Sequence, residues 1–261
     1  MIRAKKSLGQ NFLIDSDVIN QILEITEIKD KNILEIGPGT GNLTSKILEK
    51  KPRQLTVIEK DKELVDILKT NFGSDIIIIN DDILKFNECQ FENKMTVFGN
   101  LPYNISTEIL CKWILNLDSK NFWFDGMVLM FQKEVADRIT SSFNSRSYGR
   151  LSIISNWKLD IKKILDIKPS AFSPKPKVES TVLFFKPKKN FFNIKDPKNI
   201  EKITRIFFMH RRKMIKKPYN QIFEGNVAVA NKLKINLNLR PQNLNFETYF
   251  KLVNEYEKLR S

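Results

Sequence analysis

The chain has 261 residues, of which 41% are hydrophobic and 28% charged, a balance typical of globular proteins with a buried core. No apolar run approaches the roughly 18 residues that a membrane-spanning helix needs, and the basic N-terminus precedes no hydrophobic stretch typical of a secretory signal. With two cysteines, Cys89 and Cys111, and one histidine, His210, neither a disulfide framework nor a zinc site is expected. We therefore expect a cytoplasmic protein without a bound metal.

The net charge of +14 indicates a polyanionic partner, and nucleic acid is the first candidate. The excess of basic residues is unevenly distributed along the chain. Residues 1–187 carry 27 basic and 24 acidic side chains, whereas residues 188–261 carry 17 basic and 6 acidic ones. Because most of the excess lies in the last quarter of the chain, it favours a dedicated basic surface there over a general bias in composition.

The first predicted element is a helix from residue 16 onward, because Asp15 or Ser16 can cap it and apolar residues follow at helical spacing. Strands are then predicted at 31–36, 55–58, 75–80, 95–98 and 127–131, with helices at 43–50, 63–69 and 106–115. The strand at 75–80 holds four consecutive isoleucines, which predicts burial on both faces. Strands separated by helices predict a parallel sheet with right-handed crossovers.

The pattern changes in the second half of the chain. Residues 151–157 and 181–185 are β-like and are predicted to form an antiparallel edge of the sheet, with a proline-rich stretch, 169–176, between them. A linker is predicted after the second of these strands, and only helical patterns follow it. We expect a doubly wound α/β domain at 1–187 and a small basic helical domain at 188–261.

A glycine-rich turn, GPGTG at 37–41, follows the first predicted strand and precedes a helix. The acidic residue Glu59 ends the second strand and can accept hydrogen bonds from both hydroxyls of a ribose. Asp81 and Asp82 end the third strand at the same edge of the sheet. The glycines alone are equally consistent with packing, but together with these carboxylates they favour an adenosine-type cofactor without a pyrophosphate. S-adenosylmethionine fits that description.

The tetrapeptide after the fourth strand, Asn100-Leu101-Pro102-Tyr103, suits methylation of an exocyclic amine on a nucleobase. The side-chain oxygen of Asn100 and the carbonyl of Leu101 can accept the amine hydrogens, and Pro102 has no N–H to compete for them. Tyr103 offers a flat face for stacking on a single-stranded or flipped-out base. Phe172 is predicted to stack on the other face of the base, with a place in the core as the alternative.

Five motifs occur in the order found in the ribosomal RNA adenine dimethyltransferase family, which the chain resembles over nearly its whole length. They are GQNFL (9–13), EIGPG (35–39), VIE (57–59), GNLPYNIS (99–106) and FSPKPKV (172–178). QKEVADR (132–138), HRRK (210–213) and LRPQNL (239–244) also resemble family segments. The resemblance implies a Rossmann-like class I methyltransferase with a mostly parallel seven-stranded sheet and a small all-helical C-terminal domain.

The resemblance also implies the reaction and its residues. S-adenosylmethionine would donate two methyl groups to N6 of each of two adjacent adenosines in the 3′-terminal hairpin loop of small-subunit rRNA. The enzyme would act as a monomer on the assembling 30S particle and serve ribosome biogenesis. The implied cofactor-binding residues are Asn11, Leu13, Gly37, Gly39, Glu59, Asp82 and Asn100, with Asp81 in place of Asp82 if the register is shifted by one. The implied catalytic residues are Asn100, Leu101, Pro102, Tyr103 and Phe172.

A basic cluster in the C-terminal domain is expected to contact RNA phosphates. Its members are Arg211, Arg212, Lys213, Lys216 and Lys217. One departure from the family pattern follows this cluster, because Pro218 is predicted to break a helix and to space out Asn220. The departure puts local RNA contacts in doubt but leaves the chemistry unaffected.

Three alternatives stay open at this point. The antibiotic-resistance branch of the same family methylates a large-subunit rRNA adenine, and the closeness of the motifs favours the small-subunit branch over it. A non-catalytic RNA-binding assembly factor could use the same fold. The glycine turn with its carboxylates at the sheet edge and the tetrapeptide at 100–103 argue against that. A DNA adenine methyltransferase would more often carry a second proline where Leu101 stands.

Overall fold

The chain folds into two compact units. The computed structural model describes residues 4–5, 8–117 and 122–260. An α/β unit holds the described residues up to Lys112 with 122–136 and Asp160–Pro187, and a helical unit holds the rest. The chain enters the helical unit for the last time after Pro187, where the sequence predicts the domain boundary. Residues 113–117 and 137–159, which the sequence places in the first domain, belong to the helical unit.

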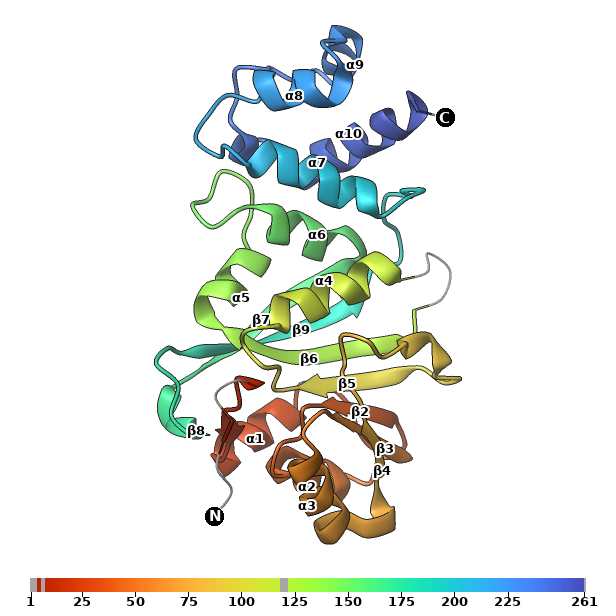
Figure 1. Ribbon diagram of the computed structural model, residues 1–261, viewed down its shortest axis with the longest axis vertical. Helices are drawn as coiled ribbons and strands as arrows, with labels where there is room; N and C mark the ends of the chain where they lie inside the picture. The colour runs from red at the N-terminus through yellow and green to blue at the C-terminus, as the bar shows by residue number, and fades with distance from the viewer. Residues whose placement is uncertain (1–3, 6–7, 118–121, 261) are drawn as a thin grey trace. The chain divides into compact units, whose positions relative to one another are not determined.

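A seven-stranded, mostly parallel sheet forms the centre of the α/β unit, which confirms the predicted fold class (Figure 1). From one edge to the other its strands are β4 (Ile77–Asn80), β3 (Gln54–Glu59), β2 (Asn32–Ile36), β5 (Met95–Gly99), β6 (Phe124–Gln132), β9 (Ser180–Pro187) and β7 (Leu159–Ile167). The register sets Ile36 beside Ile58 on one side and beside Gly99 on the other. The carboxyl ends of β2, β3 and β5 therefore meet at one edge of the sheet.

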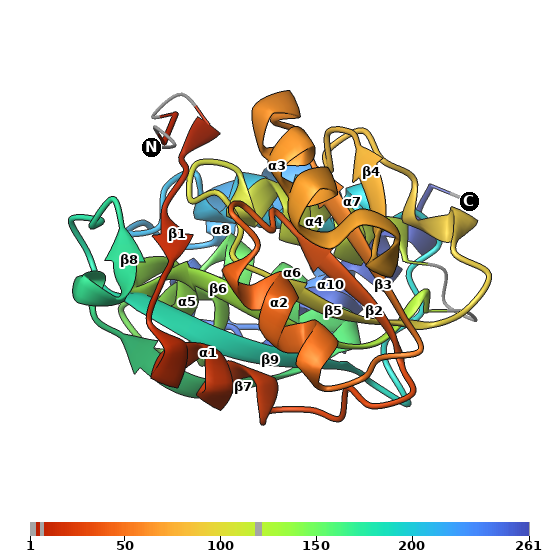
Figure 2. The same ribbon diagram turned by 90° about the horizontal axis from the view of Figure 1, so that it is seen from below.

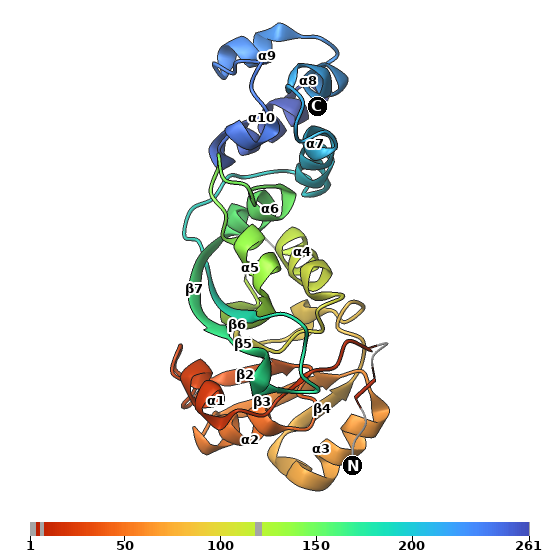
Figure 3. The ribbon, with the colours of Figure 1, turned by 90° about the vertical axis from the view of Figure 1, so that its left-hand side faces the viewer.

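Helices cover both faces of this sheet (Figures 1 and 3). On one face lie α1 (Ser16–Leu23), α2 (Asn42–Glu49) and α3 (Lys62–Phe72), and α4 (Ser106–Asn116) begins on the opposite face. The side chains of Asp15 and Asp61 accept backbone N–H groups at the starts of α1 and α3, which satisfies donors that a helix leaves unpaired. The core between helices and sheet includes Ile33, Ile47, Val57, Leu68 and Phe98, all 0% exposed.

The strand with four isoleucines is not buried on both faces, as its composition predicts. β4 lies at the edge of the sheet, and Ile77 is 46% exposed, whereas Ile76 just before the strand is buried. An edge strand has a neighbour on one side only, and here the covering helices protect it incompletely. The apolar run reflects strand propensity as much as burial.

The segment 151–157, predicted to be a strand, is instead helix α6 (Arg150–Lys158). Apolar residues and buried serines lie on every side of this helix, so no helical period is visible in the sequence. The strand missed by the prediction is β7, which begins directly after α6 and whose alternation of apolar and polar residues is interrupted at its centre by Lys163 and Ile164. β9 pairs antiparallel with β6 and also borders β7, so the antiparallel edge exists but is built from 159–167 rather than 151–157.

A second, two-stranded sheet joins two distant motifs. β1 (Phe12–Leu13) pairs antiparallel with β8 (Phe172–Ser173), with Leu13 opposite Phe172 (Figure 2). The Ile14 N–H also donates to the Ala171 carbonyl at 2.9 Å. The N-terminal segment is thereby attached to the proline-rich stretch.

The helical unit confirms the predicted helical patterns after residue 188. Its later helices are α7 (Lys198–Phe208), α8 (Lys216–Phe223), α9 (Val227–Lys232) and α10 (Phe246–Lys258). The predicted helix break at Pro218 is wrong, because Pro218 lies in the first turn of α8, where its missing N–H would have no partner in the helix. Asn220 accordingly follows within α8. In the part of the chain that the structure describes, no helix is long and apolar enough to cross a membrane.

Replacing Ile33 by Ala is expected to lower the free energy of unfolding by about 2–5 kcal/mol, because the fully buried side chain would leave a cavity. The same truncation at the half-exposed Ile77 should cost about 1 kcal/mol or less. Chemical unfolding followed by circular dichroism compares the two variants. Equal losses would mean that the edge strand is buried after all.

Candidate functional site

A pocket opens at the carboxyl ends of β2, β3 and β5. Its lining comes from the segments 8–13, 35–40, 58–60, 81–84 and 100–105, together with Asn42, Leu43 and Leu64. All seven residues predicted to bind the cofactor are among the lining residues, and so are three neighbours of Asn100, namely Leu101, Pro102 and Tyr103. The structure thus brings together side chains that are up to 92 positions apart in the sequence, because consecutive parallel strands end at one edge.

The glycine turn adopts backbone angles that only glycine accepts readily. Gly37 and Gly39 have φ angles of +65° and +61°. A Cβ on Gly39 would lie 2.6 Å from the Phe12 ring, whereas a Cβ on Gly37 would face the Asn100 carbonyl oxygen at 3.7 Å. Packing against the N-terminal segment therefore requires glycine at position 39, whereas at position 37 the positive φ alone favours it.

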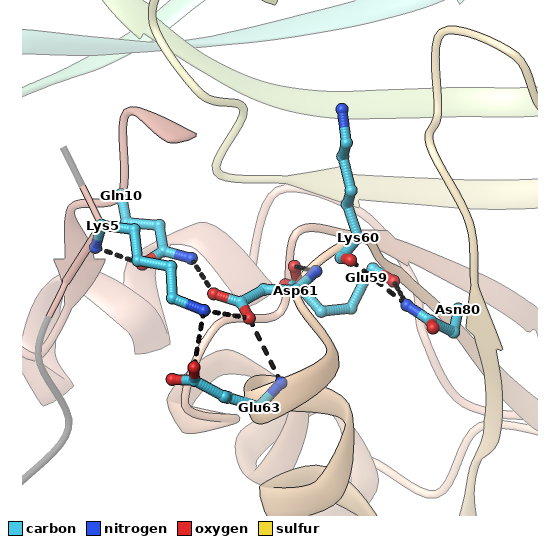
Figure 4. A network of polar contacts seen from close by, with 7 residues as sticks. All are labelled: Lys5, Gln10, Glu59, Lys60, Asp61, Glu63 and Asn80. Atoms are coloured by element: carbon cyan, nitrogen blue, oxygen red, sulfur yellow. Dashed lines mark hydrogen bonds and ion pairs between the residues drawn. The ribbon is translucent and has the colours of Figure 1, made fainter. Parts of the chain in front are cut away.

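Glu59 stands at the end of β3 and is 7% exposed. Its Oε1 accepts the Asp61 backbone N–H at 2.8 Å, and Asn80 Nδ2 donates to its backbone carbonyl at 2.8 Å (Figure 4). Burial raises the pKa of the Glu59 carboxyl, although hydrogen bonds from the backbone at Asp61, Gly39 and Lys60 oppose this shift. A buried carboxylate with a fixed orientation suits the two hydroxyls of a ribose.

Asp82 follows β4 and presents an ionised carboxylate to the pocket. Its Oδ2 accepts from Lys60 Nζ at 2.8 Å and its Oδ1 from the Leu84 N–H at 3.0 Å. The bond from Lys60 is the main reason that the pKa of Asp82 lies below its ordinary value. Asp81 is exposed and accepts the Asp82 N–H. Both aspartates line the pocket, and the contact of either one with an adenine amine stays a prediction.

Lys112 is a functional candidate that sequence reasoning missed. Its Nζ donates to the Ile83 carbonyl and to Glu88 Oε1, each at 2.7 Å, and also to the Phe86 carbonyl. These bonds attach the loop that begins with Asp82 to α4. No local motif could have revealed this, because the partners lie 24 to 29 residues away.

Glu35 is a second residue that was missed, and a signal for it existed, since it interrupts an apolar strand with a charge. It is 1% exposed, and its Oε2 accepts from Thr44 Oγ1 at 2.7 Å. Burial, with a smaller contribution from the nearby charge of Glu59, raises the pKa of Glu35 to about 8. A neutral carboxylic acid therefore lies in the pocket lining beside the charged carboxylates.

Asn100 directs its amide nitrogen toward the N-terminal segment. Its Nδ2 donates to the Asn11 carbonyl at 2.7 Å, so the amide cannot turn over without losing this bond. Leu101 is 1% exposed, which anchors the loop in the core. The hydroxyl of Tyr103 forms a hydrogen bond with Ser180 Oγ of β9, and burial raises the pKa of this phenol.

Phe172 occupies a core position in this structure, and its predicted stacking on the target base stays a prediction. The ring is 3% exposed and belongs to the apolar cluster that also contains Leu13 and Ala171, and Phe172 is absent from the pocket lining. The reason is the pairing of β1 with β8, which places Phe172 opposite Leu13. The alternative, a core position, describes this structure, and a stacking role would require the ring to leave the cluster.

The predicted RNA-binding cluster lies in the helical unit, at the turn between α7 and α8 and in the first turn of α8. Arg211 is half-buried and donates to Gln242 Oε1 at 3.0 Å and to the Ser145 carbonyl at 3.1 Å. The other members, Arg212, Lys213, Lys216 and Lys217, are exposed. Arg211 therefore also has a structural role that the sequence did not indicate.

Comparison with known proteins shows what the chain is related to. The profile of the ribosomal RNA adenine dimethylase family matches residues 1–258. The chain belongs to this family. It is 65% identical over 260 residues to the ribosomal RNA small subunit methyltransferase A of Pelagibacter ubique, and the match covers 99% of each protein.

Solved structures support the same relationship. A dimethyladenosine transferase from Plasmodium falciparum is similar with a TM-score of 0.81 and 25% identity, over 95% of this chain and 98% of that one. The 23S rRNA methyltransferase ErmE, with a TM-score of 0.68 and 21% identity over 95% and 100%, shares the fold. The predicted family, the methyltransferase class and the cofactor S-adenosylmethionine are thereby confirmed.

The residues present fit that cofactor. In this arrangement Glu59 would hold the ribose with its fixed carboxylate, and Asp82 would accept from the adenine amine. At Gly37 a Cβ would make only an ordinary contact with the Asn100 carbonyl oxygen, so the positive φ, rather than a lack of space, favours glycine. Within the described residues, no three His, Cys, Asp or Glu side chains gather in a group that could hold a metal ion.

We expect Glu35→Gln to stabilise the protein at neutral and alkaline pH. Because the folded-state pKa of about 8 lies above the ordinary value of 4.5, the stability that the neutral acid contributes is complete below pH 4.5 and is lost as the pH rises toward 8. The loss is at most about 1.4 kcal/mol per pH unit. Glutamine does not titrate and can still accept from Thr44.

The free energy of unfolding of both proteins, measured across this pH window, tests the expectation. The advantage of the variant should grow with pH and vanish at the acid end. Parallel curves would show that Glu35 is ionised in the folded protein.

Proposed function

We propose that the protein dimethylates N6 of two adjacent adenosines in the 3′-terminal hairpin loop of small-subunit rRNA. The observation that carries the proposal is the hydrogen bond from Asn100 Nδ2 to the Asn11 carbonyl at the cofactor pocket. It leaves the side-chain oxygen of Asn100 available as an acceptor for an amine. The small-subunit substrate is supported by the name of the Pelagibacter relative, a small subunit methyltransferase.

The Asn100 side-chain oxygen and the Leu101 carbonyl would accept the two hydrogens of the adenine amine. The amine is a poor nucleophile because its lone pair is delocalised into the ring, and two acceptors draw the nitrogen toward tetrahedral geometry. They also stabilise the positive charge that develops on it during transfer. Bound S-adenosylmethionine supplies the electrophilic methyl group. The methylated, cationic amine then loses a proton to water, so no histidine base is required.

Tyr103 would support the base by stacking. Its hydroxyl is attached to Ser180 of β9, which restricts the ring orientation. A base within a duplex cannot reach the pocket, so the target adenosine has to be unpaired or flipped out. A hairpin loop presents adenosines in that state.

The helical unit would bind the rRNA backbone. Four of its five predicted contact residues are exposed and positively charged, as phosphate binding requires. We further propose that the enzyme acts as a monomer in the cytoplasm on the assembling small subunit, which places it in ribosome biogenesis.

Asn100→Ala is expected to lower methyl transfer by about 100-fold or more, because one of the two acceptors at the amine is lost. The assay uses small subunits that lack the modification, with the methylated base mapped afterwards. Asn71→Ala, an exposed asparagine on α3, serves as the control and should keep full activity. Full activity in Asn100→Ala would refute the mechanism, and methylation of isolated large-subunit rRNA instead would refute the substrate.

Replacing Arg212, Lys213 and Lys216 together by Ala should weaken RNA binding and reduce its salt dependence. Each lost phosphate contact lowers the slope of log K against log salt by about 0.7–0.9, so the slope should fall by about 2–3. A control variant with Lys29, Lys50 and Lys69 replaced by Ala removes the same charge from exposed positions of the α/β unit. Equal slopes for the two triple variants would contradict a specific role for the cluster.

A further inference from the structure

Asp61, a buried acidic residue just after β3, has no part in the chemistry described above. Asp61 follows Glu59 by two residues, is 6% exposed and caps the first turn of α3 by accepting the Glu63 N–H. Its own backbone N–H donates to Glu59 Oε1 at 2.8 Å. Asp61 therefore already fixes the carboxylate that suits the ribose.

The side chain of Asp61 accepts hydrogen bonds from two residues of the N-terminal segment (Figure 4). Lys5 Nζ donates to Oδ1 at 2.8 Å, and Gln10 Nε2 donates to Oδ2 at 3.0 Å. Gln10 Oε1 in turn accepts the Lys5 backbone N–H at 2.7 Å. Burial would raise the pKa of Asp61, but the bonds from Lys5, Gln10 and the Glu63 N–H hold it below its ordinary value, so Asp61 is ionised.

Asn11, the residue after Gln10, contacts the loop after β5 that carries Asn100. The Asn11 carbonyl accepts from Asn100 Nδ2 at 2.7 Å, and two residues further on the Leu13 carbonyl accepts from Asn42 Nδ2 at 2.8 Å. Gln10 is bound to Asp61, and Asn11 to Asn100. The Glu59 carboxylate is thus linked to the Asn100 amide through Asp61, Gln10 and Asn11. Hydrogen bonds connect Glu59 to Asp61, Asp61 to Gln10, and Asn11 to Asn100, and the backbone connects Gln10 to Asn11.

We propose that Asp61 is a positioning residue for methyl transfer, which acts through Gln10 to hold the Asn11 carbonyl against the Asn100 amide. An asparagine amide can turn by half a rotation, and then it would present N–H donors to the hydrogens of the amine. The Asn11 carbonyl selects the orientation in which the oxygen faces the amine. The inference rests on the proposed function for the identity of that amine, but the bonds themselves belong to the protein alone.

Gln10→Ala removes the link while leaving Asp61 and the helix cap in place. We expect kcat to fall about tenfold, since one hydrogen bond to the Asp61 carboxylate and one from the Lys5 backbone N–H are lost. The dissociation constant of S-adenosylhomocysteine should stay within about threefold. The effect lies in kcat because the Asn100 oxygen acts on the developing charge. Glu63→Gln is the matched control, because Glu63 also pairs with Lys5, at 3.0 Å, but its side chain is 74% exposed.

Exchanging the amide and the carboxylate between positions 10 and 61 tests whether the hydrogen bond itself positions Asn11. Gln10→Glu places two carboxylates together and should be worse than Gln10→Ala. Adding Asp61→Asn provides an amide that can donate to the new carboxylate and can still cap α3, because asparagine caps helices as well as aspartate does. We expect the double variant to recover kcat to within about threefold of the wild type.

A readout that does not depend on activity is the ¹⁵N resonance of the Asn100 side-chain amide. It should shift in Gln10→Ala, stay in place in Glu63→Gln and return in the double variant. An unshifted Asn100 resonance in Gln10→Ala, or a double variant no better than Gln10→Glu alone, would overturn the inference. A wild-type protein that fails to methylate small subunits would instead refute the proposed function, and the resonance would still decide the role of Asp61.

Discussion

The hydrogen bond between the Asn100 side chain and the Asn11 carbonyl is the interaction on which the site depends. It joins the N-terminal segment to the loop after β5, and it decides which atom of the amide faces the pocket. The two segments that it joins are themselves anchored, because Leu101 is buried and β1 is paired with β8. A methyltransferase acting on an exocyclic amine needs acceptors rather than a strong base, and under the proposed function this arrangement would provide them without reorganisation during the reaction.

The charges of the pocket follow from where the sheet places them. Glu59 and Glu35 are buried at strand ends or within strands, so desolvation raises their pKa values, and Glu35 reaches about 8. Asp82 is only partly buried and is paired with Lys60, so its pKa falls. One pocket therefore contains both a neutral carboxyl group, Glu35, and an ionised one, Asp82.

Much of the fold and of the site could be predicted because the evidence is local. The glycine turn, Glu59 and Asp82 each follow a recognisable strand, and parallel strands bring their ends together. The features that could not be predicted depend on contacts with residues far away in the sequence. Helix α6 is buried on all sides and shows no period, so it resembles a strand. Phe172 is held in the core by pairing with a segment about 160 residues earlier, and Asp61 acquires its role from Lys5 and Gln10.

The most direct test of the account is a crystal structure of the protein with S-adenosylhomocysteine. We expect both ribose hydroxyls within about 3.2 Å of the Glu59 carboxylate and the sulfur facing the Asn100 loop, with Asn100 Nδ2 still bonded to the Asn11 carbonyl. A ligand bound away from this strand edge, or an Asn100 amide turned over so that its oxygen points at the N-terminal segment, would contradict it.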